Sequence, residues 1–591
     1  MGFTHLHCHS AYSLLDGLSA PEGMILRAKE LGQSSIAITD HGYLYGALKF
    51  YKAGRDHGVK PIIGVEAYLT SDVSIKDKDN RKNNHLILLA KNKAGYKNLL
   101  ELMSIAATDG KYYQPRIDHQ LLTQYHEHLI CLSGCIQGEI PQHIINDDHE
   151  KALDQAKWYQ EVFGDDFYLE VMRHHHETFI TDDTPTVIEN KLLESQAKED
   201  KYVKGLISIS DTTGIPLVAT TDAHYILPDD ALTEDLLLCV QTKQLFDNTN
   251  RPLRFIDTPT MYITSESEAL KTWSDRPDVV HRTTEIADKC EDPEITLGKF
   301  YFPKINDGGS LKDLVWDKSA QKYPDVVLDT DIQDRISFEL DVISDKGYDD
   351  YFLIVMDIIE WCRNNDIKTN TRGSVAGSIV SFILGITTVD PLEYGLPFER
   401  FLNPERPSLP DIDLDVEDVR RDDVIDYIAK RFGEDKVANI CSFGRMLSRG
   451  AIRDVGRALG YDRSHVDTIA RLIPEPRQGF PVTIDQALAD IPALQEEYKS
   501  SKDSQNILDQ ARKLEGTARH VTQHAAGVVI SPTPITNFLP LSIKDERSIT
   551  QYEMHDVEYL GLVKFDILGS TSLSILSDAE RLAGVSSTNI P

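Results

Sequence analysis

The sequence has 591 residues, enough for about four domains, and its 41% hydrophobic and 26% charged residues are typical of an ordinary globular protein. Its seven scattered cysteines exclude a disulfide scaffold, and no run approaches the ~18 apolar residues of a transmembrane helix. The start MGFTHLHCHS lacks the pattern of a secretory leader. We therefore expect a cytoplasmic protein with no membrane partner. The net charge of −32 argues against nucleic-acid binding unless basic residues gather locally.

Seven short apolar runs alternate with helical patterns over residues 1–225. Amphipathic segments such as PEGMILRAKELG separate the runs, and this alternation predicts an α/β region of parallel strands joined by helical crossovers. Seven strands could close into a barrel or lie as an open sheet, and periodicity does not choose between them. The runs are FTHLHCH (3–9), SSIAITD (34–40), KPIIGVEAYL (60–69), HLILLAK (85–91), LICLSG (129–134), FYLEVM (167–172) and PLVATTDAH (216–224).

A second alternating region begins near residue 331, after a mixed connecting stretch at 226–330. It opens with a helical pattern, continues through the Gly/Ser-rich turn TRGSVAGS (371–378) and reaches the predicted strand PDIDLDVED (410–418). Residues 424–515 are predicted to be mainly helical. Two further strands are predicted in GVVISP (527–532) and LGLVKFDIL (560–568).

Metal-ligating residue types gather at the predicted strand ends of the first region. His7 and His9 are two apart on one strand, so their side chains leave the same face, and Asp222 with His224 repeats that spacing. Barrel enzymes place catalytic groups at strand carboxyl ends, and imidazole, carboxylate and thiolate suit zinc or manganese. The alternative is chance, because a chain with 20 histidines places some at strand ends. The other candidates are His41 after the second strand, Glu66 late in the third, Cys135 after the fifth, Asp16 in the loop after the first, and His85, an exception that begins its strand.

Residues 1–225 resemble the polymerase-and-histidinol-phosphatase (PHP) family. They carry HLHCHSAYSLLDG, TDHG, GVE, NHLILLA, SGC and TDAH in the order of the family's motifs. The resemblance implies a distorted seven-stranded (β/α) barrel, up to three Zn²⁺ or Mn²⁺ ions and metal-dependent phosphoesterase activity. Some members have lost ligands and keep the domain as a scaffold, whereas here every ligand position holds a competent residue. The implied ligands are His7, His9, Asp16, His41, Glu66, His85, Cys135, Asp222 and His224.

A second candidate site lies among the carboxylates of the second region. Asp411, Asp413 and Asp415 alternate along one predicted strand, and three like charges on one face are costly unless cations neutralise them. Asp566 lies in an apolar run, with Lys564 two residues earlier on the same face. Two Mg²⁺ ions bridging such carboxylates are the usual device for in-line attack on a phosphate. The alternative is a solvated acidic edge, because DVEDVRRDD continues the charge.

Glycine-rich and basic segments supply candidate phosphate contacts. The turn TRGSVAGS could present backbone N–H groups to a phosphate before the helix SIVSFILG, although a tight structural turn explains it equally well. Arg372, Arg400 and Arg406 could donate to triphosphate oxygens. Four arginines recur every four residues and predict one positive stripe along a helix, with a solvated face as the alternative. They are Arg445, Arg449, Arg453 and Arg457.

Essentially the whole chain resembles family C, the bacterial replicative DNA polymerase III alpha subunits. Besides the PHP motifs it shares GYDDYFLIV, RGSVAGS, ITTVDPLEYGLPFERFLNPERPSLPDIDLDVED, AIRDVGRALG, RHVTQHAAGVVIS and TQYEMHDVEYLGLVKFDILG. The resemblance implies a PHP domain at 1–225 with 3′–5′ exonuclease activity, a connecting region at 226–330, a polymerase-β-like nucleotidyltransferase palm at 331–430 and 511–591, and a mainly helical thumb at 431–510. The partners it implies are primer–template DNA and deoxynucleoside triphosphates. By motif, the two Mg²⁺ ions would be held by Asp411, Asp413 and Asp566. The triphosphate would be held by Gly373, Ser374, Arg400 and Lys564. The arginine stripe would contact the DNA duplex.

Two departures from the family pattern affect these expectations. Thr369, Asn370 and Thr371 stand where the family usually has Gly-Pro-Gly, and the chain ends soon after Asp566, where the family continues into fingers and a clamp-binding region. We therefore expect a second polypeptide that carries these parts, and an apolar surface near residues 560–591. The competing explanation is that the sequence is a truncated piece of a longer chain. The alternatives are a metal-dependent phosphoesterase or exonuclease whose palm only binds DNA, and a purely structural subunit.

Overall fold

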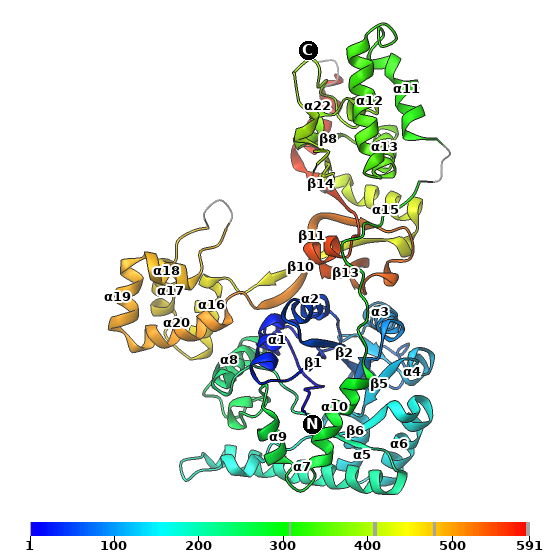
Figure 1. Cartoon of the computed structure of the whole chain (residues 1–591). Helices are drawn as coiled ribbons and strands as arrows, with labels where there is room; N and C mark the ends of the chain where they lie inside the picture. The colour runs from blue at the N-terminus through cyan, green and yellow to red at the C-terminus, as the bar shows by residue number, and fades with distance from the viewer. Residues whose placement is uncertain (1, 306–308, 406–409, 477–479, 587–591) are drawn as a thin grey trace. The chain divides into compact units, whose positions relative to one another are not determined.

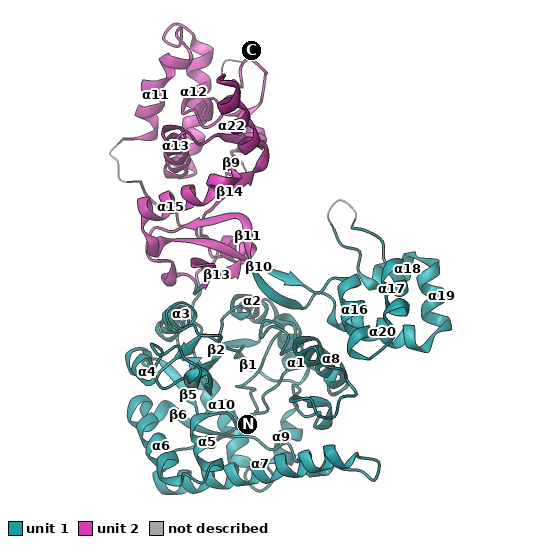
Figure 2. Ribbon diagram, turned by 180° about the vertical axis from the view of Figure 1, so that it is seen from behind, with its two compact units in different colours: residues 1–295, 443–522, 540–542 teal, residues 296–442, 523–539, 543–591 magenta. Residues whose placement is uncertain are grey.

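The computed structural model describes residues 2–305, 309–405, 410–476 and 480–586, so Arg406 lies outside the described residues. The chain forms two compact units, which Figure 2 distinguishes by colour. Unit 1 comprises residues 1–295, 443–522 and 540–542, and unit 2 comprises residues 296–442, 523–539 and 543–591. Over the described ranges, no helix combines the length and apolar character needed to cross a membrane.

Unit 1 is built on a curled seven-stranded sheet that helices surround (Figure 1). The strand order is β1-β2-β3-β5-β6-β7, with β4 paired to β2. Most strands are continuous apolar runs because both faces of the sheet are covered, and Leu6, Ile87, Ile130 and Val218 meet in its core. The strands are β1 (Ser35–Ile38), β2 (Lys60–Leu69), β3 (Asn84–Ala90), β4 (Arg116–Ile117), β5 (Leu129–Leu132), β6 (Phe167–Val171) and β7 (Leu217–Ala219). The helices are α1 (Pro21–Glu30), α2 (Ala47–His57), α3 (Lys93–Ala107), α4 (His119–Tyr125), α5 (Glu139–Ile145), α6 (His149–Phe163), α7 (Thr186–Thr213), α8 (Ala231–Thr242), α9 (Glu266–Thr272) and α10 (Pro277–Lys289).

Two features differ from the predicted parallel arrangement. β3 runs antiparallel to both β2 and β5, so its first residues lie at the edge where its neighbours end. The run FTHLHCH is not a regular strand, yet its backbone is bonded on both sides. The Ala37 N–H of β1 donates to the His5 carbonyl, and the His9 N–H donates to the Ala223 carbonyl just beyond β7. Segment 3–9 therefore takes the place of a strand between β1 and β7.

A helical bundle from the predicted thumb belongs to unit 1. Leu236 of α8 shares one hydrophobic core with Ile452, Ile469 and Ile507 of the bundle, which joins these distant segments. The predicted thumb range 431–510 is therefore divided, with its first residues in unit 2 and its helices in unit 1. The bundle helices are α16 (Ser448–Ala458), α17 (Arg463–Leu472), α18 (Ile484–Asp490), α19 (Pro492–Ser500) and α20 (Lys502–Leu514).

Unit 2 is built on a second, mixed sheet of order β12-β13-β10-β11-β14-β9-β8. β14 is parallel to β9 and antiparallel to β11, and β8 is antiparallel to β9. Helices pack on this sheet through a core that includes Phe352, Leu414 and Phe565. The strands are β8 (Thr369–Arg372), β9 (Asp413–Glu417), β10 (Val437–Arg445), β11 (Ala518–Ile530), β12 (Leu541–Lys544), β13 (Arg547–Glu553) and β14 (Lys564–Ser570). The helices are α11 (Leu311–Lys322), α12 (Thr330–Asp345), α13 (Asp349–Asn364), α14 (Ile379–Ile383), α15 (Arg421–Phe432), α21 (Met554–Tyr559) and α22 (Thr571–Ala583).

Candidate metal centres

One edge of the curled sheet collects the predicted ligands of unit 1. His41 follows β1 and forms a parallel bridge with Glu66 of β2. His85 begins β3, and because β3 is antiparallel this start lies at the same edge, bridged to Gly138 in the loop that also holds Cys135. The antiparallel strand thus explains why His85 looked exceptional in the sequence.

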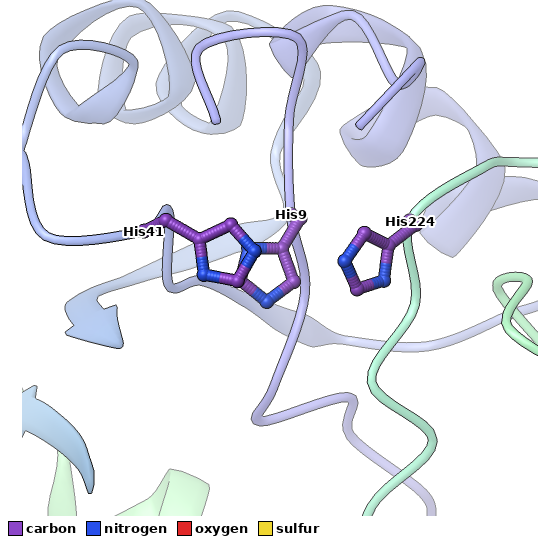
Figure 3. A group of neighbouring side chains, drawn as sticks. All are labelled: His9, His41 and His224. Atoms are coloured by element: carbon purple, nitrogen blue, oxygen red, sulfur yellow. The ribbon is translucent and has the colours of Figure 1, made fainter. Parts of the chain in front are cut away.

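The side chains at this edge form three overlapping groups, and within each group the potential ligand atoms lie within 4.8 Å of one another. The imidazoles of His9, His41 and His224 converge, as Figure 3 shows. Glu66 belongs to both of the other groups and so joins them. These groups are His7, His9 and Glu66, and Glu66, His85 and Cys135.

Glu66 lies at the centre of the cluster and is fully buried. Its Oε2 atom lies 2.6 Å from His41 Nδ1 and 3.3 Å from His9 Nε2. Its Oε1 atom lies 2.7 Å from His85 Nδ1 and 3.8 Å from Cys135 Sγ. The two oxygens of one carboxylate therefore face two different sets of donors, a geometry suited to bridging two cations.

Two aspartates complete the cluster. Asp222 Oδ1 lies 3.1 Å from the Nε2 atoms of both His7 and His9. Asp16 Oδ2 lies 3.5 Å from His41 Nε2. The structure therefore brings all nine predicted side chains into one neighbourhood within unit 1.

This donor set fits bound metal ions. Six buried polar atoms of the cluster make no hydrogen bond of favourable geometry with the described residues, although Glu66 Oε2 and His41 Nδ1 lie only 2.6 Å apart. This state is costly, and coordination of a cation would relieve it. Burial acts to lower the pKa of His7, yet the surrounding carboxylates, Asp222 first, raise it well above its ordinary value. Burial also raises the pKa of the Cys135 thiol well above its usual range, so a thiolate there requires a nearby cation. The six atoms are His7 Nε2, His9 Nε2, Asp16 Oδ1, His41 Nδ1, Glu66 Oε2 and Asp222 Oδ1.

Glu170 touches this cluster and was not among the predicted residues. It lies on β6, is buried, and accepts a 2.7 Å hydrogen bond from His7 Nδ1. A charged residue inside the apolar run FYLEVM must find a partner when it is buried, which is the feature that could have revealed it.

The second candidate centre joins Asp411, Asp413 and Asp566 in unit 2. The register of β9 and β14 places Asp413 beside Asp566, while Asp411 precedes β9 instead of lying within it as predicted. One oxygen of each carboxylate lies within 4.8 Å of the others. Lys564 Nζ lies 2.7 Å from Asp566 Oδ2 and 4.0 Å from Asp411 Oδ1. One ammonium facing three carboxylates leaves negative charge that divalent cations would neutralise.

Asp415 shares a face with Asp413, as predicted, but has another partner. Its Oδ1 accepts a 2.7 Å hydrogen bond from Arg372 Nη2, because antiparallel β8 lies alongside β9. Arg372, predicted to contact a triphosphate, is thus already engaged by a carboxylate. Thr369, Asn370 and Thr371 form the body of β8.

A cavity of about 480 Å³ opens beside this centre. Asp411 and Lys564 line it, together with Phe300, Glu558 and Tyr559. Glu558 was not predicted, although its Oε1 atom lies 3.9 Å from Lys564 Nζ. The lysine therefore faces a space large enough for part of a nucleotide.

Gly373 and Ser374 belong to the short 3-10 helix η6 (Gly373–Gly377), which precedes α14. Gly373 has a φ of +87°, in the left-handed region that glycine tolerates. The carboxylate of buried Glu339 accepts hydrogen bonds of 3.1 Å from the Ile379 N–H and 3.2 Å from the Val380 N–H. A bound phosphate therefore cannot use these N–H groups of α14. The turn before the helix, to which the sequence assigns this role, is still available for it.

Arg335 of α12 connects this turn to the 3-10 helix η7 (Phe398–Arg400). Its Nη2 donates to the carbonyls of Gly377 at 2.9 Å and Leu396 at 3.2 Å. Arg400 is exposed, and its guanidinium has no hydrogen bond or ion pair within the described parts of the chain. The arginine that the sequence assigns to the triphosphate is thus open to a ligand.

The predicted arginine stripe is not uniform. Arg445 ends β10 instead of standing on the helix, and it donates to the Tyr12 hydroxyl at 3.3 Å. Arg449 and Arg453 stand on α16, and both are paired with acidic side chains of neighbouring segments. Arg457 is exposed and has no ion pair in the described ranges. Of the four arginines, Arg457 is the one whose guanidinium is open to a phosphate.

Proteins of known family match nearly the whole chain. Residues 309–569 match the family model of the bacterial DNA polymerase III alpha NTPase domain, and residues 5–174 match that of the PHP domain. DNA polymerase III subunit alpha of Borreliella burgdorferi is 41% identical over 593 residues, covering 98% of this chain and 49% of that protein. The subunits of Chlamydia muridarum and Vibrio cholerae are each 36% identical, over 98% and 97% of this chain and 50% and 48% of their own lengths.

The similarity to solved structures is much weaker. A crystal structure of a metal-dependent phosphoesterase from Bifidobacterium adolescentis is 12% identical, covers 37% of this chain and 87% of its own, and has a TM-score of 0.18, which supports no functional statement. The assignment to a family therefore rests on the family models and the sequence relatives. The chain spans about half the length of the relatives it matches. The chain belongs to the bacterial DNA polymerase III alpha family and corresponds to its amino-terminal portion, with the PHP and NTPase domains.

Proposed function

We propose that this chain provides the palm of a DNA-directed DNA polymerase, with primer–template DNA and deoxynucleoside triphosphates as substrates, and a PHP domain that removes nucleotides from 3′ ends. The grouping of Asp411, Asp413 and Asp566 beside Lys564 carries the polymerase proposal. The intact donor set around Glu66 supports the exonuclease proposal. We also infer that the curled sheet and segment 3–9 together form the distorted barrel of the PHP family.

In the palm, the three aspartates would hold two Mg²⁺ ions, which offset the charge that develops during phosphoryl transfer. Burial acts to lower the pKa of Lys564, but its hydrogen bond with Asp566 raises that pKa above the usual value, so the side chain remains an ammonium. It can therefore attract a triphosphate from within the cavity. The turn with Gly373 and Ser374, together with the open guanidinium of Arg400, would orient the same group.

In the PHP domain, the nine clustered side chains would hold up to three Zn²⁺ or Mn²⁺ ions, which supply Lewis-acid activation for phosphodiester hydrolysis. Glu66 fixes the spacing between two sets of donors. Asp222 orients the Nε2 faces of His7 and His9 toward a common point. Metal analysis of the purified chain should find more than one transition-metal ion, and a protein that takes up none would favour the scaffold alternative.

Reciprocal substitutions separate the two activities. Asp222→Asn should abolish release of 3′-terminal nucleotides from labelled DNA and leave primer extension by the assembled polymerase intact. Asp411→Asn should lower that extension by orders of magnitude, because it removes a ligand of the ions that stabilise the transition state, and should spare the exonuclease. Full exonuclease activity in Asp222→Asn would show that the PHP site is misassigned.

We propose further that polymerisation needs a second polypeptide with fingers and a clamp-binding region. No residue in the described helix α22 is buried, and Ile575 and Leu582 are 64% and 85% exposed. These side chains give α22 the apolar surface expected near residues 560–591, and exposed apolar patches typically mark interaction sites. If no combination of chains extends a primer, the alternatives of a DNA-binding phosphoesterase and a structural subunit gain support.

A further inference from the structure

Glu170 is a buried carboxylate in contact with the metal cluster. Its Oε1 accepts hydrogen bonds from His7 Nδ1 at 2.7 Å and from the Thr220 hydroxyl at 2.5 Å. Its backbone N–H donates to the Ser133 hydroxyl at 2.9 Å, and β6 is paired on both sides, with β5 and β7. The carboxylate is therefore held by segment 3–9 and by Thr220 just beyond β7. Its backbone is fixed between β5 and β7, so the side chain has little freedom to turn away from His7.

The contact with Glu170 decides which ring nitrogen of His7 faces the cluster. An ionised carboxylate can only accept a hydrogen bond, so Nδ1 must carry the proton and Nε2 must point inward. Nε2 lies 3.1 Å from Asp222 Oδ1 and 3.4 Å from Glu66 Oε1. Once Nε2 has no proton, three acceptor atoms face one another, and these are the atoms that would hold a divalent cation.

The neighbouring ligand His9 has a different support. Its Nδ1 lies 3.0 Å from the Ser13 hydroxyl, and Ser13 in turn donates to Asp40 Oδ1 at 2.9 Å. The charge of Asp40 thus reaches His9 through an intervening hydroxyl, whereas Glu170 bonds to His7 directly. Of the two proposed ligand histidines on segment 3–9, His7 receives the stronger electrostatic support.

We propose that Glu170 is a positioning residue of the PHP site, which fixes the tautomer of His7 and strengthens this imidazole as a ligand for a divalent transition metal. The inference rests on the metal-binding function proposed above. Carboxylate partners of ligating histidines typically change metal affinity by about 10–100-fold. Removing the charge of Glu170 should therefore weaken metal binding while the metal-ligating side chains all remain.

The test measures Zn²⁺ affinity of the full chain by competition with a chromophoric chelator. Glu170→Gln preserves the shape of the side chain and should lower the affinity about 10-fold, and Glu170→Ala should lower it by up to about 100-fold. Glu139→Gln is the matched control, because Glu139 also contacts a histidine, His119 Nε2 at 3.1 Å, but lies outside the cluster. Its Zn²⁺ affinity should equal that of the unsubstituted chain.

Two further measurements separate positioning from folding. The melting temperature of the metal-free chain should be similar with and without Glu170→Gln. If Glu170→Ala fails to fold, the Zn²⁺ affinity of Glu170→Gln alone tests the proposal. Absorption bands of Co²⁺ bound in place of Zn²⁺ should shift in Glu170→Gln and stay unchanged in Glu139→Gln. Unchanged Zn²⁺ affinity in Glu170→Gln, or an equal loss in Glu139→Gln, would overturn the proposal. An unsubstituted chain that binds no Zn²⁺ would instead refute the PHP metal site itself.

Discussion

At the scale of single residues, neighbouring strands decide which carboxylates act together. Asp413 and Asp415 share a face, as the two-residue period of a strand requires. Arg372 of β8 pairs with Asp415, however, whereas Asp566 of β14 lies beside Asp413. The sequence could predict the shared face from local spacing, but the partner of each carboxylate depends on strand order, which local patterns do not encode.

Glu199 gives a prediction for the pH dependence of stability. Burial raises its pKa from 4.5 to about 7. A carboxyl group with a higher pKa in the folded than in the unfolded protein loses stability on ionising, so the free energy of unfolding should fall as pH rises through this range. Glu199→Gln lacks this titration. Between pH 5 and pH 8, the unsubstituted chain should therefore lose about 2 kcal/mol relative to the variant in urea unfolding experiments.

An exposed glutamate provides the control for this experiment. Glu161 of α6 belongs to the same unit and is exposed. The stability curve of Glu161→Gln should run parallel to that of the unsubstituted chain from pH 5 to pH 8. Parallel curves for Glu199→Gln as well would show that Glu199 keeps an ordinary pKa in the folded protein.

At the scale of elements, the sequence predicted where strands lie better than how they run. The apolar runs of unit 1 locate β1 to β3 and β5 to β7 to within a few residues. A continuously apolar strand carries no mark of its direction, so β3 was wrongly expected to be parallel. β10 was missed because it lies within 424–515, where helical patterns dominate.

The arginine stripe gives a prediction at this scale. Arg457→Ala should weaken duplex DNA binding and reduce the salt dependence by about one unit of slope, because it removes one phosphate contact. Arg453→Ala should change the slope less, since Asp467 Oδ1 lies 2.8 Å from the guanidinium of Arg453. Fluorescence anisotropy over a series of salt concentrations measures both effects. Arg55→Ala on α2, another exposed arginine of unit 1, serves as the control.

Either of two results would count against this assignment. An unchanged salt slope in Arg457→Ala would make the stripe a solvated face of α16. An equal change in Arg55→Ala would mean that the measurement reports overall charge and no local contact. The whole chain has a net charge of −32, which does not favour DNA. A loss of DNA affinity in Arg457→Ala but not in Arg55→Ala would therefore indicate a local contact at Arg457.

At the scale of the whole molecule, each candidate centre lies within a single compact unit. The PHP cluster uses residues of unit 1 alone, and the aspartate centre uses residues of unit 2 alone. The strands β10 and β11 each begin in one unit and end in the other, so the chain passes between the units along regular structure. Single substitutions should therefore affect one chemistry at a time.

The last prediction concerns the second polypeptide. A polymerase must close a surface over the new base pair. In the proposed palm, the aspartate centre would supply the metal and triphosphate contacts, and we assign no such closing surface to the described residues. The chain alone should fail to extend a primer, and a polypeptide with fingers should restore extension.

Replacing both Ile575 and Leu582 of α22 with serine should then lower the restored rate about 10-fold, because it removes exposed apolar contact area, while 3′-nucleotide release persists. Asp578→Ser, on the same helix, should leave the restored rate unchanged. Efficient primer extension by the 591-residue chain without any partner would refute the requirement.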